Sequence, residues 1–276
     1  MGNCAWVFIR SWCRSRVIPK HMFDTQTIPL VIAAALIGGM IGLDRTALGQ
    51  FMISQPVVAG PLTGWLLGDT TAGLVIGGTL ELIWVLDMPI GTFVPADATV
   101  AAVAATAIAA LGSTVPGQLP VIGFSLLLTV LMVPVTMFAD HLMRQRNAQI
   151  PELAMTASGR PTEWSVTFWH MGGMIAFFLK PFLLCLALIP AGLAAVFWFK
   201  ALPDAFGRAM ELFITFLPLL GAAAAARRLS MNTLDRTLLI GFFVGAVCVQ
   251  VFRLPELAAI MIAAAGGWLG VRSHGA

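Results

Sequence analysis

The longest uncharged stretch of this chain, residues 98–139, constrains the fold more than any other feature of the sequence. A helix needs roughly 20 mainly apolar residues to cross the hydrocarbon core of a bilayer. Residues 98–139 are therefore long enough for two crossings, and the turn-forming segment 112–120 divides them. We predict two membrane helices in this part of the chain.

The composition of the whole chain agrees with a membrane protein. Apolar residues make up 59% and charged residues 11% of the chain, whereas average soluble domains carry about 25% charged residues. The mean hydropathy is +0.91. The net charge of +3 is small and scattered, which argues against nucleic-acid binding, because that function needs a basic patch or stripe.

The hydropathy pattern predicts an all-α, polytopic protein with roughly eight hydrophobic segments. Besides 98–139, these segments are residues 29–43, 46–68, 70–86, 171–199, 212–226, 238–252 and 257–271. Prolines and glycines interrupt the segment 46–68, and such short, broken segments are typical of discontinuous or re-entrant helices. Gly60, Gly64 and Gly68 recur at four-residue spacing, which favours either close helix packing or a pore-lining role.

One long polar stretch, residues 140–170, predicts a division of the chain into two membrane halves, 22–139 and 171–276. A Pro-Leu-x-Gly element occurs in each half, at Pro61 and at Pro218, which is consistent with an internal repeat. Residues 1–21 differ in character from the rest, and we expect them to be an atypical N-terminal extension with Met22 as an alternative start.

Four carboxylates, Asp69, Glu81, Asp87 and Asp97, stand within or beside apolar segments. Charged groups at membrane depth are costly and usually face a protein interior or a water-filled cavity. Asp is a favoured N-cap residue, so capping is the preferred alternative for Asp69 and stays open for Asp97. For Glu81 we favour function over a structural carboxylate paired with a neighbour. Asp87 is also explained by a position near the interface with water.

These carboxylates suit a sugar, because one carboxylate can accept hydrogen bonds from two adjacent hydroxyls. The amides of Gln50 and Gln55 offer both a donor and an acceptor. The rings of Trp65 or Trp84 could cover the apolar face of a pyranose, although interfacial anchoring explains either tryptophan alone better.

Several other functions lack their sequence motifs. The chain has no Gly-x-x-x-x-Gly-Lys-Ser/Thr loop for ATP and no His-Glu-x-x-His metal motif. Its four cysteines show no metal-ligand spacing, and none of its four histidines lies deep within an apolar run. We therefore expect no metal, no cofactor and no phosphohistidine. A membrane enzyme acting on lipid is disfavoured, because no nucleophile with a base stands in the apolar region.

The region 50–102 contains three motifs that together resemble a known family. They read QFMISQPVVAGPLTGWLLGD at 50–69, GLVIGGTLEL at 73–82 and IGTFVPAD at 90–97. This is similar to the IIC subunit of the mannose/fructose/sorbose class of the phosphoenolpyruvate-dependent sugar phosphotransferase system. The family pattern is Arg-Pro-(Leu/Ile/Val)-Val-x-Gly-Pro-Leu-x-Gly-x-x-Leu-Gly-Asp, then Gly-x-x-Leu-Glu and Ile-Gly-x-x-x-Pro-x-Asp.

The resemblance implies a permease subunit without catalytic residues of its own, in a bacterial cytoplasmic (inner) membrane. Such a subunit binds a hexose-type sugar and carries it inward within an oligomeric complex. Its partners are a IID membrane subunit and the phosphocarrier proteins IIB and IIA, of which phosphorylated IIB phosphorylates the sugar. By position in the motifs, Glu81 and Asp97 are the first candidates for sugar contact, followed by Asp69, Gln50 and Thr79.

The chain departs from the family pattern at Gln55, where the family usually has an arginine before the proline. A positive charge that could balance the nearby carboxylates is therefore missing at this position. A stand-alone ion- or proton-coupled transporter that uses Glu81 as its coupling site remains the alternative function.

Overall fold

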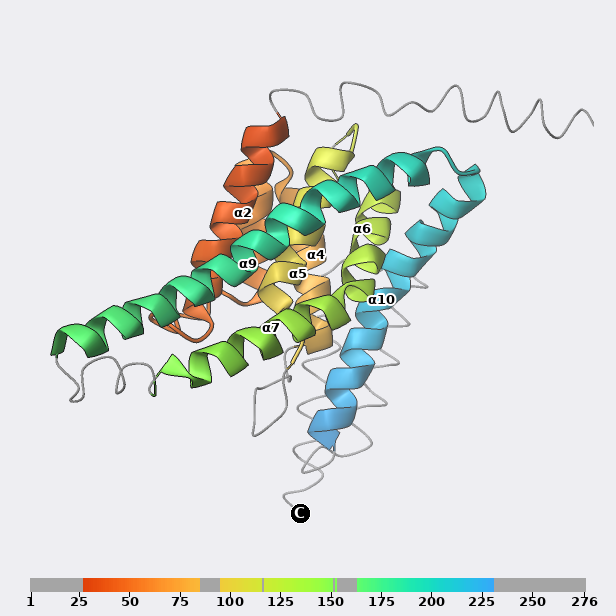
Figure 1. The fold of residues 1–276 in the computed structure, drawn as a ribbon. Coiled ribbons are helices and arrows are strands. Elements are labelled where there is room, and N and C mark those ends of the chain that lie inside the picture. Colours follow the sequence, from red (N-terminus) through yellow and green to blue (C-terminus); the bar gives the residue numbers. More distant parts are fainter. Residues whose placement is uncertain (1–26, 85–94, 116, 151, 153–162, 231–276) are drawn as a thin grey trace, which may run out of the picture. The chain divides into compact units, whose positions relative to one another are not determined.

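The computed structural model describes residues 27–84, 95–115, 117–150, 152 and 163–230, and this part of the chain is helical apart from its turns and connections (Figure 1). Asp87, the segment 238–271 and residues 1–22 lie outside the described residues. The described helices are α2 (Thr27–Asp44), α3 (Pro56–Leu67), α4 (Thr70–Trp84), α5 (Ala98–Gly112), α6 (Leu119–Leu131), α7 (Val133–Ala148), α9 (Glu163–Lys200) and α10 (Asp204–Ser230).

The chain divides into two compact units, one up to Leu217 and one from Pro218 onward. All the helices before α10 belong to the first unit, and α10 crosses the boundary. Of the polar stretch 140–170, residues 140–148 are the end of α7 and residues 163–170 begin α9. The division into halves 22–139 and 171–276, and the internal repeat, stay predictions.

Helix α5 is the centre of the first unit. It packs against α2, α3, α4, α6 and α9, and every residue from Thr99 to Ala109 is buried. A helix that is apolar all round is typical of the core of a large or membrane protein. Its many alanines let the surrounding helices approach closely, because a methyl group is the smallest side chain after that of glycine.

Helices α3 and α4 form a short hairpin. They have 12 and 15 residues, which correspond to about 18 and 22 Å at 1.5 Å per residue and fall short of the roughly 30 Å hydrocarbon core. Two glycines of each helix form the contact, and a Cβ on Gly60 would lie 2.5 Å from the carbonyl oxygen of Gly73. Close packing therefore accounts for Gly60 and Gly64, which had two explanations from sequence.

Gly68 has a different role, because it ends α3 in the left-handed conformation with φ of 83° and a Cβ added to it would meet nothing within 4 Å. We expect Gly68→Ala to cost about 1–2 kcal/mol of stability, since alanine in this conformation is strained. Gly68→Asn should cost less, because asparagine tolerates left-handed backbone. Thermal unfolding of the purified variants measures both, and an equal loss in both would contradict this explanation.

Within the described part of the chain, three helical segments are long and apolar enough to cross a membrane, namely Thr27–Asp44, Thr167–Lys200 and Asp204–Ala223. The pair α6 and α7 passes the same test jointly, with a bend of 43° between its members. The prediction of an all-α membrane protein is confirmed. The second crossing predicted within 98–139 begins in α6 as expected, but the bent helix continues past residue 139 into the polar residues of α7.

Candidate functional site

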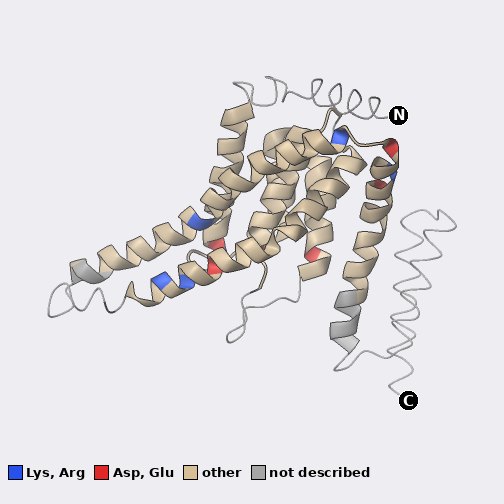
Figure 2. Ribbon diagram, turned by 45° about the vertical axis from the view of Figure 1, so that its right-hand side comes forward, with Lys and Arg blue, Asp and Glu red and all other residues tan. Residues whose placement is uncertain are grey.

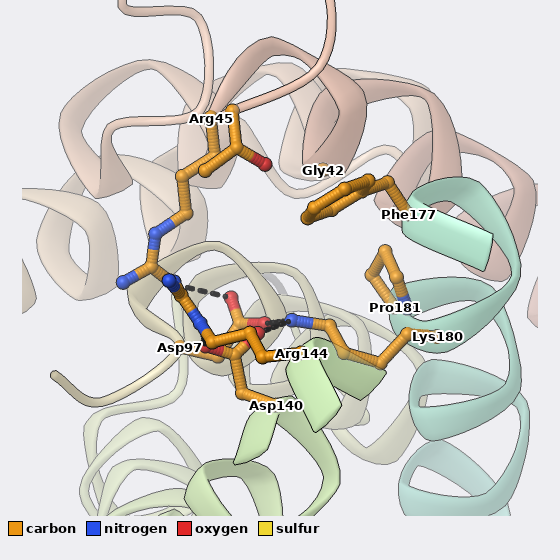
Figure 3. A pocket seen from close by; sticks show the side chains of 9 residues that line it. Gly42, Arg45, Asp97, Asp140, Arg144, Phe177, Lys180 and Pro181 are labelled. Atoms are coloured by element: carbon orange, nitrogen blue, oxygen red, sulfur yellow. Dashed lines mark hydrogen bonds and ion pairs between the residues drawn. The ribbon is translucent and has the colours of Figure 1, made fainter. Parts of the chain in front are cut away.

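A cluster of five charged side chains joins four helices in the first unit. It contains Arg45 directly after α2, Asp97 directly before α5, Asp140 and Arg144 on α7, and Lys180 on α9. Figure 2 shows how few charged residues the helices carry, and Figure 3 shows these five converging. We call them the charge cluster.

Asp97 is the most buried member of the charge cluster, with 3% of its side chain exposed. Its Oδ1 accepts a hydrogen bond of 3.2 Å from the backbone N–H of Val100 and thereby caps α5. Arg45 Nη1 lies 3.2 Å from the same oxygen, and Arg45 Nη2 donates to the carbonyl of Ala96 at 3.1 Å. Lys180 Nζ donates to Asp97 Oδ2 at 2.6 Å. Capping and ion pairing therefore coexist at this carboxylate.

Lys180 bridges two carboxylates. Its Nζ lies 2.6 Å from Asp97 and 2.7 Å from Asp140 Oδ1, and Arg144 Nε donates to Asp140 Oδ2 at 3.0 Å. Three cations thus face two carboxylates, which gives the charge cluster a formal net charge of +1. Asp97 is therefore balanced by Arg45 and Lys180, although Gln55 carries no charge.

The position of Lys180 depends on the contact between α2 and α9. Its neighbour Pro181 lies so close to Gly42 of α2 that a Cβ on Gly42 would be 2.5 Å from Pro181 Cγ. Because Gly42 has no side chain, α9 approaches α2 at this point and Lys180 reaches Asp97. The cavity among these residues is only about 10 Å³, which is on the scale of one water molecule. The charge cluster is therefore closed to a sugar in this structure.

Glu81 lies at the end of the hairpin where α3 begins. Its Oε2 accepts a hydrogen bond of 3.3 Å from the backbone N–H of Val57. Val57 belongs to the first turn of α3, where backbone N–H groups lack partners inside the helix and a negative charge is favoured by the helix dipole. Glu81 therefore caps α3, a local role that is compatible with contacts to a ligand.

The loop between α2 and α3 lies between the contacts of Glu81 and the contacts of Asp97. Ser54 of this loop accepts a hydrogen bond of 2.8 Å from Thr99, in the first turn of α5. Asp44, at the end of α2, accepts from the backbone N–H groups of Phe51 and Ser54 at 2.7 and 3.1 Å. Gln50 is exposed in this loop with φ of 54°. Asp97 thus contacts Arg45 at the start of the segment that contains Gln50, and Glu81 contacts Val57 just after its end.

Asp69 lies at the other end of the hairpin. It caps α4 through Ala72 N at 2.9 Å and accepts from Gly117 N at 2.8 Å, so the capping alternative describes its contacts. Glu81 lies twelve positions further along the chain on α4, or about 18 Å at 1.5 Å per residue. The structure therefore does not bring Asp69 together with Glu81.

Thr79 is buried, and its hydroxyl donates to the carbonyl of Val75 at 2.7 Å.

Lys180 and Asp140 are absent from the site predicted from sequence. Lys180 is the only charged residue in the apolar segment 171–199. The rule that singled out Glu81, a charge at membrane depth, therefore applies equally to Lys180. Asp140 gave no comparable signal, because it begins a polar stretch in the sequence.

Comparisons with known proteins agree on one family. Residues 25–270 match the family model described as PTS system sorbose-specific IIC component. The chain is 32% identical over 122 residues to the PTS system mannose-specific EIIC component of Escherichia coli K12, covering 42% of this chain and 44% of that protein. It is 23% identical over 224 residues to the PTS system sorbose-specific EIIC component of Klebsiella pneumoniae, covering 78% and 80%. The match to the Escherichia coli protein thus spans less than half of that protein's length.

Two solved structures share the fold. One, described as a structure of a membrane protein, has a TM-score of 0.63 at 21% identity and covers 91% of this chain and 96% of its own. The other is a mannose transporter ManYZ in complex with microcin E492, with a TM-score of 0.52 at 20% identity and the same coverage. At these identities the likeness concerns the fold alone.

Proposed function

This chain belongs to the family of sorbose-specific IIC components of the phosphotransferase system, and we propose that it is the membrane subunit that binds a hexose-type sugar and carries it inward for phosphorylation. The observation that supports this function best is that two carboxylates, Asp97 and Glu81, contact the residues at the two ends of the α2–α3 loop, beside the short hairpin of α3 and α4. Both stand in the motifs that match the family. The stand-alone ion- or proton-coupled transporter is not favoured.

In this proposal Glu81 and Asp97 accept hydrogen bonds from sugar hydroxyls. Carboxylates suit this task because each oxygen is a strong acceptor. Gln50 borders the same loop and can both donate and accept, and Thr79 stands two residues before Glu81 on α4. Asp69 holds the far end of the hairpin through its two backbone bonds, and it contributes to sugar contact only after a movement of the hairpin.

The proposed partners are a IID membrane subunit, a IIB protein that delivers the phosphoryl group and a IIA protein that recharges IIB. The chain would act in a bacterial cytoplasmic (inner) membrane. Its own residues supply binding and passage, and the phosphoryl chemistry takes place on IIB. The family match supports a role within a phosphotransferase system, and the ManYZ complex of a protein with the same fold supports a second membrane subunit as partner.

Uptake into membrane vesicles tests the proposal. Vesicles containing this chain and its IID partner should accumulate sugar phosphate only when phosphorylated IIB is present, because IIB donates the phosphoryl group. Vesicles with the IID partner alone are the control and should accumulate none. Uptake of free sugar driven by an ion gradient without IIB would contradict the proposal and favour the coupled transporter.

A further inference from the structure

We propose that Lys180 competes with the sugar for Asp97, so that the charge cluster is a latch that opens when sugar binds. This inference rests on the proposed function, because it assigns Asp97 to the sugar site. Lys180 is then a positioning residue, which controls when Asp97 is available and makes no contact with the sugar itself.

The contacts of Asp97 show why the charge cluster and a sugar exclude each other. Oδ1 already has the Val100 N–H and the Arg45 guanidinium, and Oδ2 has the Lys180 ammonium at 2.6 Å. A carboxylate offers about four acceptor positions; on Asp97 two of them accept hydrogen bonds, from Val100 and Lys180, and the Arg45 guanidinium lies against Oδ1 as an ion-pair partner. The surrounding cavity of about 10 Å³ has room for about one water molecule. A pair of sugar hydroxyls reaches Asp97 only after one partner has withdrawn.

Lys180 is the partner that can withdraw at the lowest cost. Removing a buried charge from its partner is strongly unfavourable when the charge is left alone, but Lys180 keeps Asp140 at 2.7 Å. Its ammonium also sits on a flexible four-carbon stem with three rotatable donors. Arg45 is held additionally by the carbonyl of Ala96, and its withdrawal would break that bond as well.

A proline, Pro181, interrupts the hydrogen bonding of α9 directly beside Lys180. Pro181 has no N–H, so the carbonyl one turn earlier lacks its usual helical partner, and proline rings favour a kink there. The Pro181 ring also packs directly against Gly42 of α2, which has no side chain. A change in the bend of α9 at Pro181 would therefore move Lys180 relative to Asp97, which is fixed at the start of α5.

The key variant is Lys180→Met, which removes the charge and keeps an unbranched side chain. Asp97 retains Arg45 and Asp140 retains Arg144, so each carboxylate keeps a cation and the variant should fold. Without the competitor, the sugar dissociation constant should fall by about five- to tenfold, at the low end of typical coupling between sites.

The matched variant is Asp140→Asn, for which we expect the opposite result. Lys180 then loses its second carboxylate and remains with Asp97, so the sugar dissociation constant should rise by a similar factor of about five. Local disruption of the α7–α9 contact would change binding in the same direction in both variants. The opposite signs therefore distinguish competition from a structural role.

The experiment is a titration of the purified chain with its IID partner by mannose, sorbose, fructose and N-acetylgalactosamine, the sugars named for related proteins. Tighter binding by Lys180→Met with weaker binding by Asp140→Asn supports the latch. Weaker or unchanged binding by Lys180→Met overturns the latch and leaves the proposed function intact, provided that the wild type binds. A wild type that binds none of the sugars overturns the proposed function and the latch with it.

Discussion

Gly73→Ala is expected to lower the stability of the protein by about 2–3 kcal/mol, in the upper range for overpacking. A Cβ at this position would overlap the carbonyl oxygen of Gly60 and would lie 2.9 Å from Gly60 C and 3.0 Å from Pro61 Cα. All three are backbone atoms of α3, so no side chain can rotate away and the hairpin must open. The midpoint of thermal unfolding in detergent should fall by about 5–10 °C.

Gly78→Ala is the matched control, because Gly78 lies on the same helix and a Cβ added to it would have open space within 4 Å. Alanine favours helix over glycine by about 1 kcal/mol, so this variant should unfold at the wild-type temperature or slightly above it. Equal losses in the two variants would show that α4 does not tolerate any added methyl group, and the close contact with α3 would then not be the cause.

Asp97→Asn and Glu81→Gln are each expected to weaken sugar binding by about 100-fold, which corresponds to about 2.7 kcal/mol and to one hydrogen bond with a charged group. Asparagine is also a favoured N-cap, and Lys180 keeps Asp140, so Asp97→Asn should still fold. Glutamine in place of Glu81 retains an oxygen that can accept the N–H of Val57. Titration calorimetry of the purified variants with the sugar that the wild type binds measures the loss.

Asp69→Asn decides whether the far end of the hairpin belongs to the site. The contacts of Asp69 with Ala72 and Gly117 hold backbone in place, so the variant should lose stability and change sugar affinity by less than about twofold, a difference of about 0.4 kcal/mol. A loss as large as that of Asp97→Asn would bring Asp69 into contact with the sugar during transport. Unchanged binding in Asp97→Asn and Glu81→Gln would remove both residues from the site.

Much of the fold could be predicted from local properties of the sequence. The uncharged stretch 98–139 contains α5 and α6, and the turn-forming residues between them separate the two helices as predicted, although α5, with 15 residues, is shorter than the crossing expected there. The interrupted segment 46–68 contains only the 12-residue helix α3, which Gly68 ends. These predictions succeeded because hydropathy, proline and glycine act on a few neighbouring residues, whatever the rest of the chain does.

The candidate site could be predicted only in part, because local sequence patterns do not show which distant residues come together. Glu81 and Asp97 stand out as charges within or beside apolar segments, and a motif shows which residue types are present at which spacing. A motif does not show that Asp69 and Glu81 lie at opposite ends of one helical hairpin. That separation follows from the length and direction of α4, with Asp69 directly before it and Glu81 near its end.

The sequence by itself determined that this protein is an all-α membrane protein with an interrupted hydrophobic segment at 46–68 and acidic groups near it, because hydropathy and the positions of proline, glycine and carboxylates are local properties of the chain. Only the tertiary structure decided the partners of those acidic groups. Lys180 is separated from Asp97 by 83 positions and from Asp140 by 40. Their pairing depends on the close contact of α2 with α9 at Gly42 and Pro181, since ion pairs form between groups that packing has already brought together.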